Sequence, residues 1–312
     1  MGAQIPQPIF QAEALCARVG RIALLDDLNL VLRAGEVVAV IGESGSGKSL
    51  LGRAIAGLVP RGVGLSGTMQ MDGCTLPPPG CSRWAALWGS HIAHLRQDAR
   101  AALNPLTPIG AQVQAVLVRH QGRKAAAMAV ARLMEAGLPA DMISARPDAL
   151  SGGQSQLAAL ACVLATPARL VIADEPTSAL DGPAAAHVMA LMRARATAGA
   201  AVVVMTHDLA LAAGADRLVV LHAGQICEDR STDQALIHPG HPYTVALLGA
   251  NPAHADRLDA LRPLAGGLPD LTAADVPACR FVDRCVHAMA QCRDVRPRMR
   301  AGIACHRLLG LK

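Results

Sequence analysis

The chain has 312 residues, enough for one or two domains with a large core. Hydrophobic residues make up 52% and charged residues 17%, yet no run of about 18 apolar residues is free of charge and proline, which argues against a membrane-spanning helix. The net charge is +5, and residues 280–312 hold eight basic against two acidic side chains, so the rest of the chain is close to neutral. The N-terminal segment lacks a basic start followed by an apolar core, so it predicts no secretory signal.

The first predicted elements are strands, a glycine-rich loop and a helix. Residues 28–41 have the pattern of two strands around a turn at Ala34-Gly35. Residues 42–49, GESGSGKS, follow at once and match the phosphate-loop pattern G-x-x-x-x-G-K-S. The next apolar residues fall on one face of a helix: Leu50, Leu51, Ala54, Ile55 and Leu58.

This loop predicts a nucleotide site. Its glycines let the backbone present successive N–H groups to the β-phosphate, and the N-terminus of the following helix also favours an anion. Lys48 is expected to reach the β- and γ-phosphates, and Ser49 to ligate Mg²⁺ through its hydroxyl. The residues predicted to bind ATP here are Gly42, Glu43, Ser44, Gly45, Ser46, Gly47, Lys48 and Ser49.

The middle of the chain changes from helical to strand patterns. Residues at about 98–165 are predicted to form a helical subdomain. Apolar strand patterns return at residues 170–173, 201–205 and 218–221 with helices between them, which is typical of a mainly parallel sheet.

Two carboxylates stand at the end of the first of these strands. Asp174 is expected to hold Mg²⁺ through water, and Glu175 to act as the general base that polarises the attacking water. A pair of strand-end carboxylates making ordinary salt bridges is the alternative.

Between the two nucleotide motifs, residues 150–154 spell LSGGQ. This sequence in this position resembles the ATP-binding-cassette (ABC) ATPases. The resemblance implies an α/β fold with an ABC-type P-loop NTPase core, a parallel sheet with flanking helices, an antiparallel β subdomain, a helical subdomain and a loop-rich C-terminal extension. It also implies that Ser151, Gly152, Gly153 and Gln154 cap the ATP held by an opposite cassette.

The same resemblance assigns further roles. Gln97 would complete the coordination of Mg²⁺ and water, and His207 would contact the γ-phosphate and orient the water. Residues 178–181, which end in Asp181, would communicate with the opposite subunit's site. The expected catalytic residues are therefore Lys48, Gln97, Glu175 and His207, and the expected Mg²⁺ ligands are Ser49, Gln97 and Asp174.

Three departures from the family pattern affect the expected rate. Val19 stands where the family places an aromatic residue on adenine, Ser155-Gln156-Leu157 replaces Arg-Gln-Arg, and Arg96 replaces an aromatic or aliphatic residue before Gln97. Because base stacking is worth roughly 1–3 kcal/mol, we expect weakened nucleotide affinity. No catalytic group is missing, so a slow but active ATPase is predicted.

Nine cysteines fall into two groups. Five are scattered and are expected to be buried or incidental thiols in a reducing compartment: Cys16, Cys74, Cys81, Cys162 and Cys227. Four are clustered with the spacing C-x5-C-x6-C-x12-C: Cys279, Cys285, Cys292 and Cys305. Four thiolates can hold a [4Fe–4S] cluster or a tetrahedral zinc ion. The wide gaps favour the cluster; zinc, no metal at all, and a basic nucleic-acid arm are the alternatives.

The cysteine segment resembles the C-terminal extension of dipeptide and oligopeptide importer ATPases, and residues 241–244 match that group's HPYT element. The predicted domains are an ABC ATPase domain, residues 1–240, and this extension, residues 241–312. The implied function is ATP hydrolysis that energises the uptake of di- and oligopeptides. A nickel or other solute importer, a soluble ABC ATPase acting on nucleic acid or ribosomes, and a regulatory cassette without turnover are the alternatives.

The resemblance also implies an assembly. The implied partners are a second, non-identical ABC ATPase subunit, two integral-membrane permease subunits and an extracytoplasmic solute-binding protein. No direct contact with nucleic acid is expected. The chain would lie peripherally on the cytoplasmic face of the inner membrane.

Overall fold

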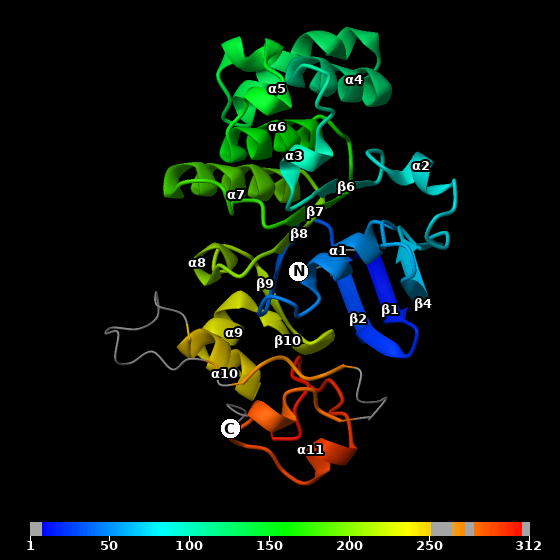
Figure 1. Ribbon diagram of the computed structural model, residues 1–312, viewed down its shortest axis with the longest axis vertical. Helices are drawn as coiled ribbons and strands as arrows, with labels where there is room; N and C mark the ends of the chain where they lie inside the picture. Colours follow the sequence, from blue (N-terminus) through cyan, green and yellow to red (C-terminus); the bar gives the residue numbers. More distant parts are fainter. Residues whose placement is uncertain (1–7, 251–263, 265, 272–277, 308–312) are drawn as a thin grey trace, which may run out of the picture. The chain divides into compact units, whose positions relative to one another are not determined.

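The computed structural model describes residues 8–250, 264, 266–271 and 278–307 (Figure 1). The chain divides into two compact units, each made of separate stretches of sequence. Unit 1 comprises residues 1–9, 33–37 and 80–204, and unit 2 comprises residues 10–32, 38–79 and 205–312.

Unit 1 contains strands in the order β8-β7-β6, with bounds β6 (Ile92–Leu95), β7 (Leu170–Asp174) and β8 (Ala201–Met205). Strands β6 and β7 are parallel, with Ile92 opposite Leu170. Every residue of β7 and β8 is buried, which explains why their sequences are continuous apolar runs and do not alternate.

The described elements between residues 98 and 165 are all helical. The helices of unit 1 are α2 (Trp84–Leu87), α3 (Ala99–Ala102), α4 (Ile109–Gln121), η1 (Arg123–Met128), α5 (Ala129–Glu135), η2 (Ala140–Ser144), η3 (Pro147–Ala149), α6 (Gly152–Leu164) and α7 (Gly182–Thr197). Helices α4, α5 and α6 contact one another (Figure 1). Four of their apolar side chains are completely buried: Val113, Leu117, Leu133 and Leu160.

Unit 2 contains an antiparallel sheet in the order β2-β1-β4-β5, with bounds β1 (Pro8–Val19), β2 (Ile22–Arg33), β4 (Gly64–Met71) and β5 (Cys74–Thr75). Burial alternates along β2, as expected for a sheet with one packed face. A second group runs in the order β10-β9-β3, with bounds β3 (Val37–Ile41), β9 (Arg217–His222) and β10 (Gln225–Ser231). Strand β9 is parallel to β3 and antiparallel to β10.

The helices of unit 2 are α1 (Lys48–Ile55), α8 (Leu209–Ala212), α9 (Thr232–Ile237), α10 (Pro242–Gly249), η6 (Val282–Arg284) and α11 (Gln291–Asp294). Helix α1 ends at Ile55, before Gly57 with its φ of 69°. Leu58 therefore lies beyond the helix with 39% of its surface exposed, so the prediction that it shares one face of this helix was wrong. Throughout the described part of the chain, every helix is too short or too polar to cross a bilayer.

Candidate functional site

The phosphate loop, residues 42–49, follows β3 in unit 2. Gly42, Gly45 and Gly47 have φ values of 155°, 81° and 105°, a region of backbone conformation that favours glycine. Helix α1 begins with Gly47 as its N-cap and with no side-chain cap. Lys48 Nζ lies across the loop, where it donates to the carbonyl oxygens of Gly42 at 2.7 Å and Glu43 at 3.1 Å. The loop thus has the local geometry that phosphate binding requires.

Glu43 is held from outside the loop. Its backbone N–H donates to the hydroxyl of Tyr243 at 2.9 Å, and burial raises the pKa of Tyr243, which keeps the phenol neutral. Its carboxylate accepts hydrogen bonds from Nη1 and Nη2 of Arg284 at 2.9 and 3.0 Å. His222 Nδ1 lies 3.7 Å from Glu43 Oε1, but burial lowers the pKa of His222 to about 4. Because His222 is neutral at pH 7, Arg284 is the charged partner.

His207 lies in unit 2 together with the phosphate loop. The backbone N–H of Thr206 donates to the carbonyl of Val40 at 3.1 Å, which places the residue before His207 beside the strand that leads into the loop. Asp208, on the other side, caps helix α8 by accepting from the N–H of Ala210 at 2.8 Å. The His207 side chain is exposed.

The carboxylate pair at the end of β7 belongs to unit 1. Asp174 is 2% exposed and Glu175 is 8% exposed. Glu175 has a φ of 50°, in the left-handed region that residues other than glycine rarely adopt. Such strain persists only where neighbouring contacts hold the backbone, and it concentrates at functional sites.

Gln156 supplies those contacts. This side chain on α6 is 2% exposed; its Nε2 donates to the Glu175 carbonyl at 2.7 Å, and its Oε1 accepts from the N–H of Ala179 at 3.2 Å. Ser178 Oγ also donates to the Glu175 carbonyl, at 3.2 Å. From the sequence, Gln156 was noted only as part of a departure from the family pattern, and this role was not predicted. The signal present in the sequence was an amide directly before the apolar run of residues 157–164.

The LSGGQ segment lies in the same unit and begins α6 with a capping box. Ser151 Oγ accepts from the N–H of Gln154 at 3.1 Å, and the side chain of Gln154 accepts from the N–H of Ser151 at 2.9 Å. Gly153 lies so close to the following loop that an added Cβ would come within 2.8 Å of the Ala179 carbonyl. The structure therefore brings LSGGQ and the segment after Glu175 together.

The remaining predicted residues of unit 1 lie at two turns. Asp181 caps helix α7 by accepting from the N–H of Ala184 at 2.9 Å. Gln97 is exposed and lies two residues beyond the end of β6 at Leu95.

The four clustered cysteines of unit 2 line one small cavity, together with Phe281 and Pro297. The N–H of Cys279 donates to the Cys292 carbonyl at 2.9 Å, and the N–H of Met289 donates to Cys292 Sγ at 3.5 Å. Burial raises the pKa of Cys279 to about 11. The four thiols therefore lie around one cavity, but no set of three or more His, Cys, Asp or Glu among the described residues is arranged to hold a metal ion. All nine cysteines are described, and each is a free thiol.

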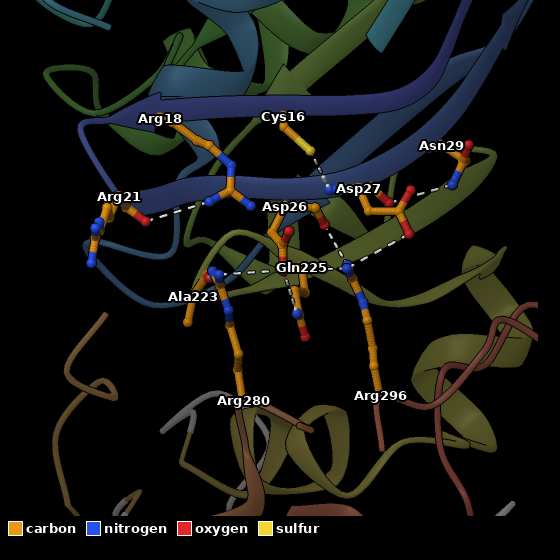
Figure 2. Close-up of polar contacts among 10 residues, drawn as sticks. All are labelled: Cys16, Arg18, Arg21, Asp26, Asp27, Asn29, Ala223, Gln225, Arg280 and Arg296. Carbon is orange, nitrogen blue, oxygen red and sulfur yellow. Dashed lines mark hydrogen bonds and ion pairs between the residues drawn. The ribbon is translucent and has the colours of Figure 1, made fainter. Parts of the chain in front are cut away.

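Arginines of the extension bind the antiparallel sheet through Asp26 of β2 (Figure 2). Arg280 Nη2 and Arg296 Nη1 lie 3.3 and 3.2 Å from Asp26 Oδ2. Gln225 Nε2 also donates to this oxygen, at 3.0 Å. Arg280 additionally donates to the Ala223 carbonyl, and Arg296 to the Asp26 carbonyl. Two of the eight basic side chains of the tail therefore attach it to the rest of unit 2.

Comparisons with known proteins agree with this geometry. Residues 25–178 match the ABC transporter family, and residues 227–292 match the oligopeptide/dipeptide transporter C-terminal region. The oligopeptide transport ATP-binding protein AppD of Bacillus subtilis is 33% identical over 88% of this chain and 87% of its own. The dipeptide transport ATP-binding protein DppD of Haemophilus influenzae is 34% identical over 88% of this chain and 86% of its own.

The chain belongs to the ABC transporter ATPases. Its fold is similar to that of the dimeric ATP-binding cassette MJ0796 bound to ADP and Pi, with a TM-score of 0.65 and 26% identity over 72% of this chain and 98% of that chain. The CbiO1 cassette of Clostridium perfringens, at 23% identity, has a similar fold with a TM-score of 0.63 over 74% of this chain and 91% of its own. The predicted family and α/β P-loop fold are confirmed, and this ABC ATPase binds and hydrolyses ATP.

Proposed function

We propose that this ABC ATPase energises the uptake of di- and oligopeptides through partner membrane subunits. The observation that carries the proposal is the C-terminal region, which matches that of oligopeptide/dipeptide transporters and is joined here to the phosphate loop through Tyr243 and Glu43. Relatives named for dipeptide and oligopeptide transport span nearly the same length of chain.

The proposed chemistry assigns a role to each of the predicted catalytic and Mg²⁺-binding residues. Lys48 binds the phosphates, Glu175 polarises the attacking water, and His207 and Gln97 orient it. Ser49, Gln97 and Asp174 hold Mg²⁺, which when bound would neutralise phosphate charge. The near-complete burial of Asp174 at a strand end and the held backbone of Glu175 support these roles.

The LSGGQ residues and Asp181 are proposed to act on the ATP of a second, non-identical cassette. The dimeric state of the MJ0796 cassette supports such pairing. We further propose that the pair docks on two integral-membrane permease subunits at the cytoplasmic face of the inner membrane, and that an extracytoplasmic solute-binding protein delivers the cargo.

The four cysteines are proposed to hold a [4Fe–4S] cluster, with zinc or no metal as the alternatives. Their convergence on one cavity and the N–H donor to Cys292 Sγ support a thiolate-bound group. The bound cluster would cross-link segments that are otherwise rich in loops. Iron and acid-labile sulfide in the anaerobically purified protein would support the [4Fe–4S] assignment. Stoichiometric zinc would instead assign the site to zinc.

The deciding experiment is uptake in a strain that lacks the gene, complemented with the wild type or with Lys48→Ala. Labelled di- and oligopeptides are tested beside nickel. We expect the wild type alone to restore peptide uptake. Restoration of nickel uptake alone would assign the protein to metal import, and restoration of neither would overturn the proposal.

The rate of hydrolysis is tested on the purified transporter. We expect a low ATPase rate that is well above that of the Glu175→Gln variant, because Val19 offers no aromatic ring to adenine. Equal rates for the two proteins would overturn the assignment of Glu175 as the base.

A further inference from the structure

The side chain of Glu43 in the phosphate loop contacts Arg284 of the cysteine extension. Arg284 binds it through two parallel hydrogen bonds, at 2.9 Å to Oε1 and 3.0 Å to Oε2. The Arg284 side chain is 8% exposed and that of Glu43 is 25% exposed, so solvent screens this pair only in part. Two-pronged arginine–carboxylate contacts fix geometry as well as charge.

Two more contacts tie the loop to the C-terminal part of unit 2. The Tyr243 hydroxyl accepts from the Glu43 N–H at 2.9 Å, and the Tyr243 ring packs edge-on against Phe281 with centroids 5.3 Å apart. A Cβ added to Gly45 would come within 2.8 Å of Leu268 Cδ1, so this leucine lies against the loop. Both the backbone and the side chain of the phosphate loop are therefore held from outside.

The charge of Glu43 makes the tie relevant to ATP. A carboxylate within a loop that binds phosphates repels the substrate unless a cation compensates it. Lys48 points to backbone carbonyls of the loop, and the cation at the Glu43 carboxylate is Arg284. Loss of Arg284 would thus remove both hydrogen bonds that anchor the Glu43 side chain and the positive charge that compensates its carboxylate, while Tyr243 would still hold the Glu43 backbone.

Arg284 is in turn positioned by the turn between two of the clustered cysteines, residues 279–285, which we call the cysteine loop. It directly precedes Cys285, and its guanidinium lies 5.7 Å from the centroid of the Phe281 ring. The Arg284 N–H donates to the Phe281 carbonyl at 3.1 Å, and the Cys285 N–H donates to the Val282 carbonyl at 3.3 Å. Arg284 can reach Glu43 only while this turn between two of the cavity's cysteines keeps its fold.

We propose that Arg284 is a positioning residue for ATP binding: it anchors and neutralises Glu43, so that nucleotide affinity depends on the fold of the cysteine loop. The coupling is reciprocal, because whatever the loop contributes to nucleotide binding, the nucleotide contributes to the loop. This inference depends on ATP binding and is independent of the transported solute.

The first test measures the dissociation constant of Mg-AMP-PNP on the assembled transporter. We expect Arg284→Gln to weaken binding about tenfold, within the usual range of coupling between sites. The double variant Glu43→Gln/Arg284→Gln should recover to within about threefold of the wild type, since the uncompensated carboxylate is gone. Steady-state kinetics should show a raised KM for ATP and a nearly unchanged kcat.

Arg293→Gln is the matched control. Arg293 belongs to the same extension and pairs with Asp283 at 2.8 Å, but both side chains are exposed, at 64% and 72%. This variant should bind Mg-AMP-PNP as the wild type does. Wild-type affinity in Arg284→Gln, or a double variant as weak as the single one, would overturn the proposal.

The second test reads the reverse direction of the coupling by hydrogen–deuterium exchange. Mg-AMP-PNP should slow amide exchange in residues 278–292 of the wild type, and this protection should be lost in Arg284→Gln. The exchange pattern without nucleotide shows whether the variant is folded. Protection that survives in a folded Arg284→Gln protein, or that is missing in the wild type, would contradict the proposal.

Discussion

The phosphate loop and the LSGGQ segment both lead into a helix, but they prepare its N-terminus differently. In the phosphate loop, left-handed glycines precede α1 and no side chain caps it. In LSGGQ, Ser151 and Gln154 form a capping box, so two backbone N–H groups are satisfied inside the segment. The first helix leaves its N-terminus for an anion, whereas the second is partly satisfied by its own side chains. This difference is consistent with LSGGQ adding contacts to an ATP that another loop already holds.

The largest effect is expected from a substitution that distorts the phosphate loop. In Gly42→Ala the new Cβ would come within 2.2 Å of the Leu221 carbonyl at a φ of 155°, so the backbone must move. We expect nucleotide affinity to fall about a hundredfold, since misplacement by about 1 Å can have effects of that size. Gly64→Ala is the control, because its Cβ would meet only the Arg18 carbonyl at 3.9 Å. Equal nucleotide titrations for the two variants would refute the close fit around Gly42.

The next prediction separates the two glycines of LSGGQ. A Cβ on Gly153 would lie 2.8 Å from the Ala179 carbonyl, whereas one on Gly152 would meet Ala179 Cβ at an ordinary 3.7 Å. Gly153→Ala should cost about 1–3 kcal/mol of stability by overpacking. Gly152→Ala should be neutral or slightly stabilising, because alanine favours a helix. Denaturant unfolding of the two variants checks this prediction. If Gly152→Ala were less stable than Gly153→Ala, the close approach of Gly153 to Ala179 would not determine stability here.

A smaller effect sharpens the contrast in capping. Ser151→Ala removes the cap of α6 and should lower stability by about 1 kcal/mol. Ser151→Asp keeps an acceptor for the Gln154 N–H and should retain stability, while its negative charge should repel a γ-phosphate and reduce ATPase activity. If both variants lose activity in parallel with stability, the role of Ser151 is limited to capping helix α6.

The smallest predicted effect is a loss of folding stability as the pH falls from 7 to 6. Burial lowers the pKa of His222 to about 4 and of His241 to about 3, so both are neutral in the folded chain. The unfolded chain takes up these protons near pH 6.5, so stability is lost as the pH falls below that value. Between pH 7 and pH 6 we expect a loss of about 0.7 kcal/mol for each histidine.

His222→Phe should remove one of these contributions. Phenylalanine keeps the ring contact with Tyr243, whose centroid lies 4.3 Å away, without a titrating group. Stability measured by denaturant unfolding at pH 7 and pH 6 should then depend less steeply on pH. An unchanged slope would show that His222 is not the acid-sensitive group.

Much of the nucleotide-binding machinery could be predicted because its geometry is encoded locally. The glycines at 42, 45 and 47 lie where the backbone needs left-handed φ values, and a continuous apolar run before Asp174 marks a buried strand. The end of α1 was less predictable: Leu58 continues the helical pattern of apolar residues, but Gly57 adopts a left-handed φ just after the helix ends at Ile55.

The sequence by itself determined the family, the phosphate loop, the strand-end carboxylates and the four-cysteine pattern, since each depends on residue types at short spacing. Only the tertiary structure decided which distant side chains meet. Arg284 reaches Glu43 across 241 positions, and Arg280 reaches Asp26 across 254. No periodicity links such partners, because their contact results from the packing of whole elements and not from local backbone preference.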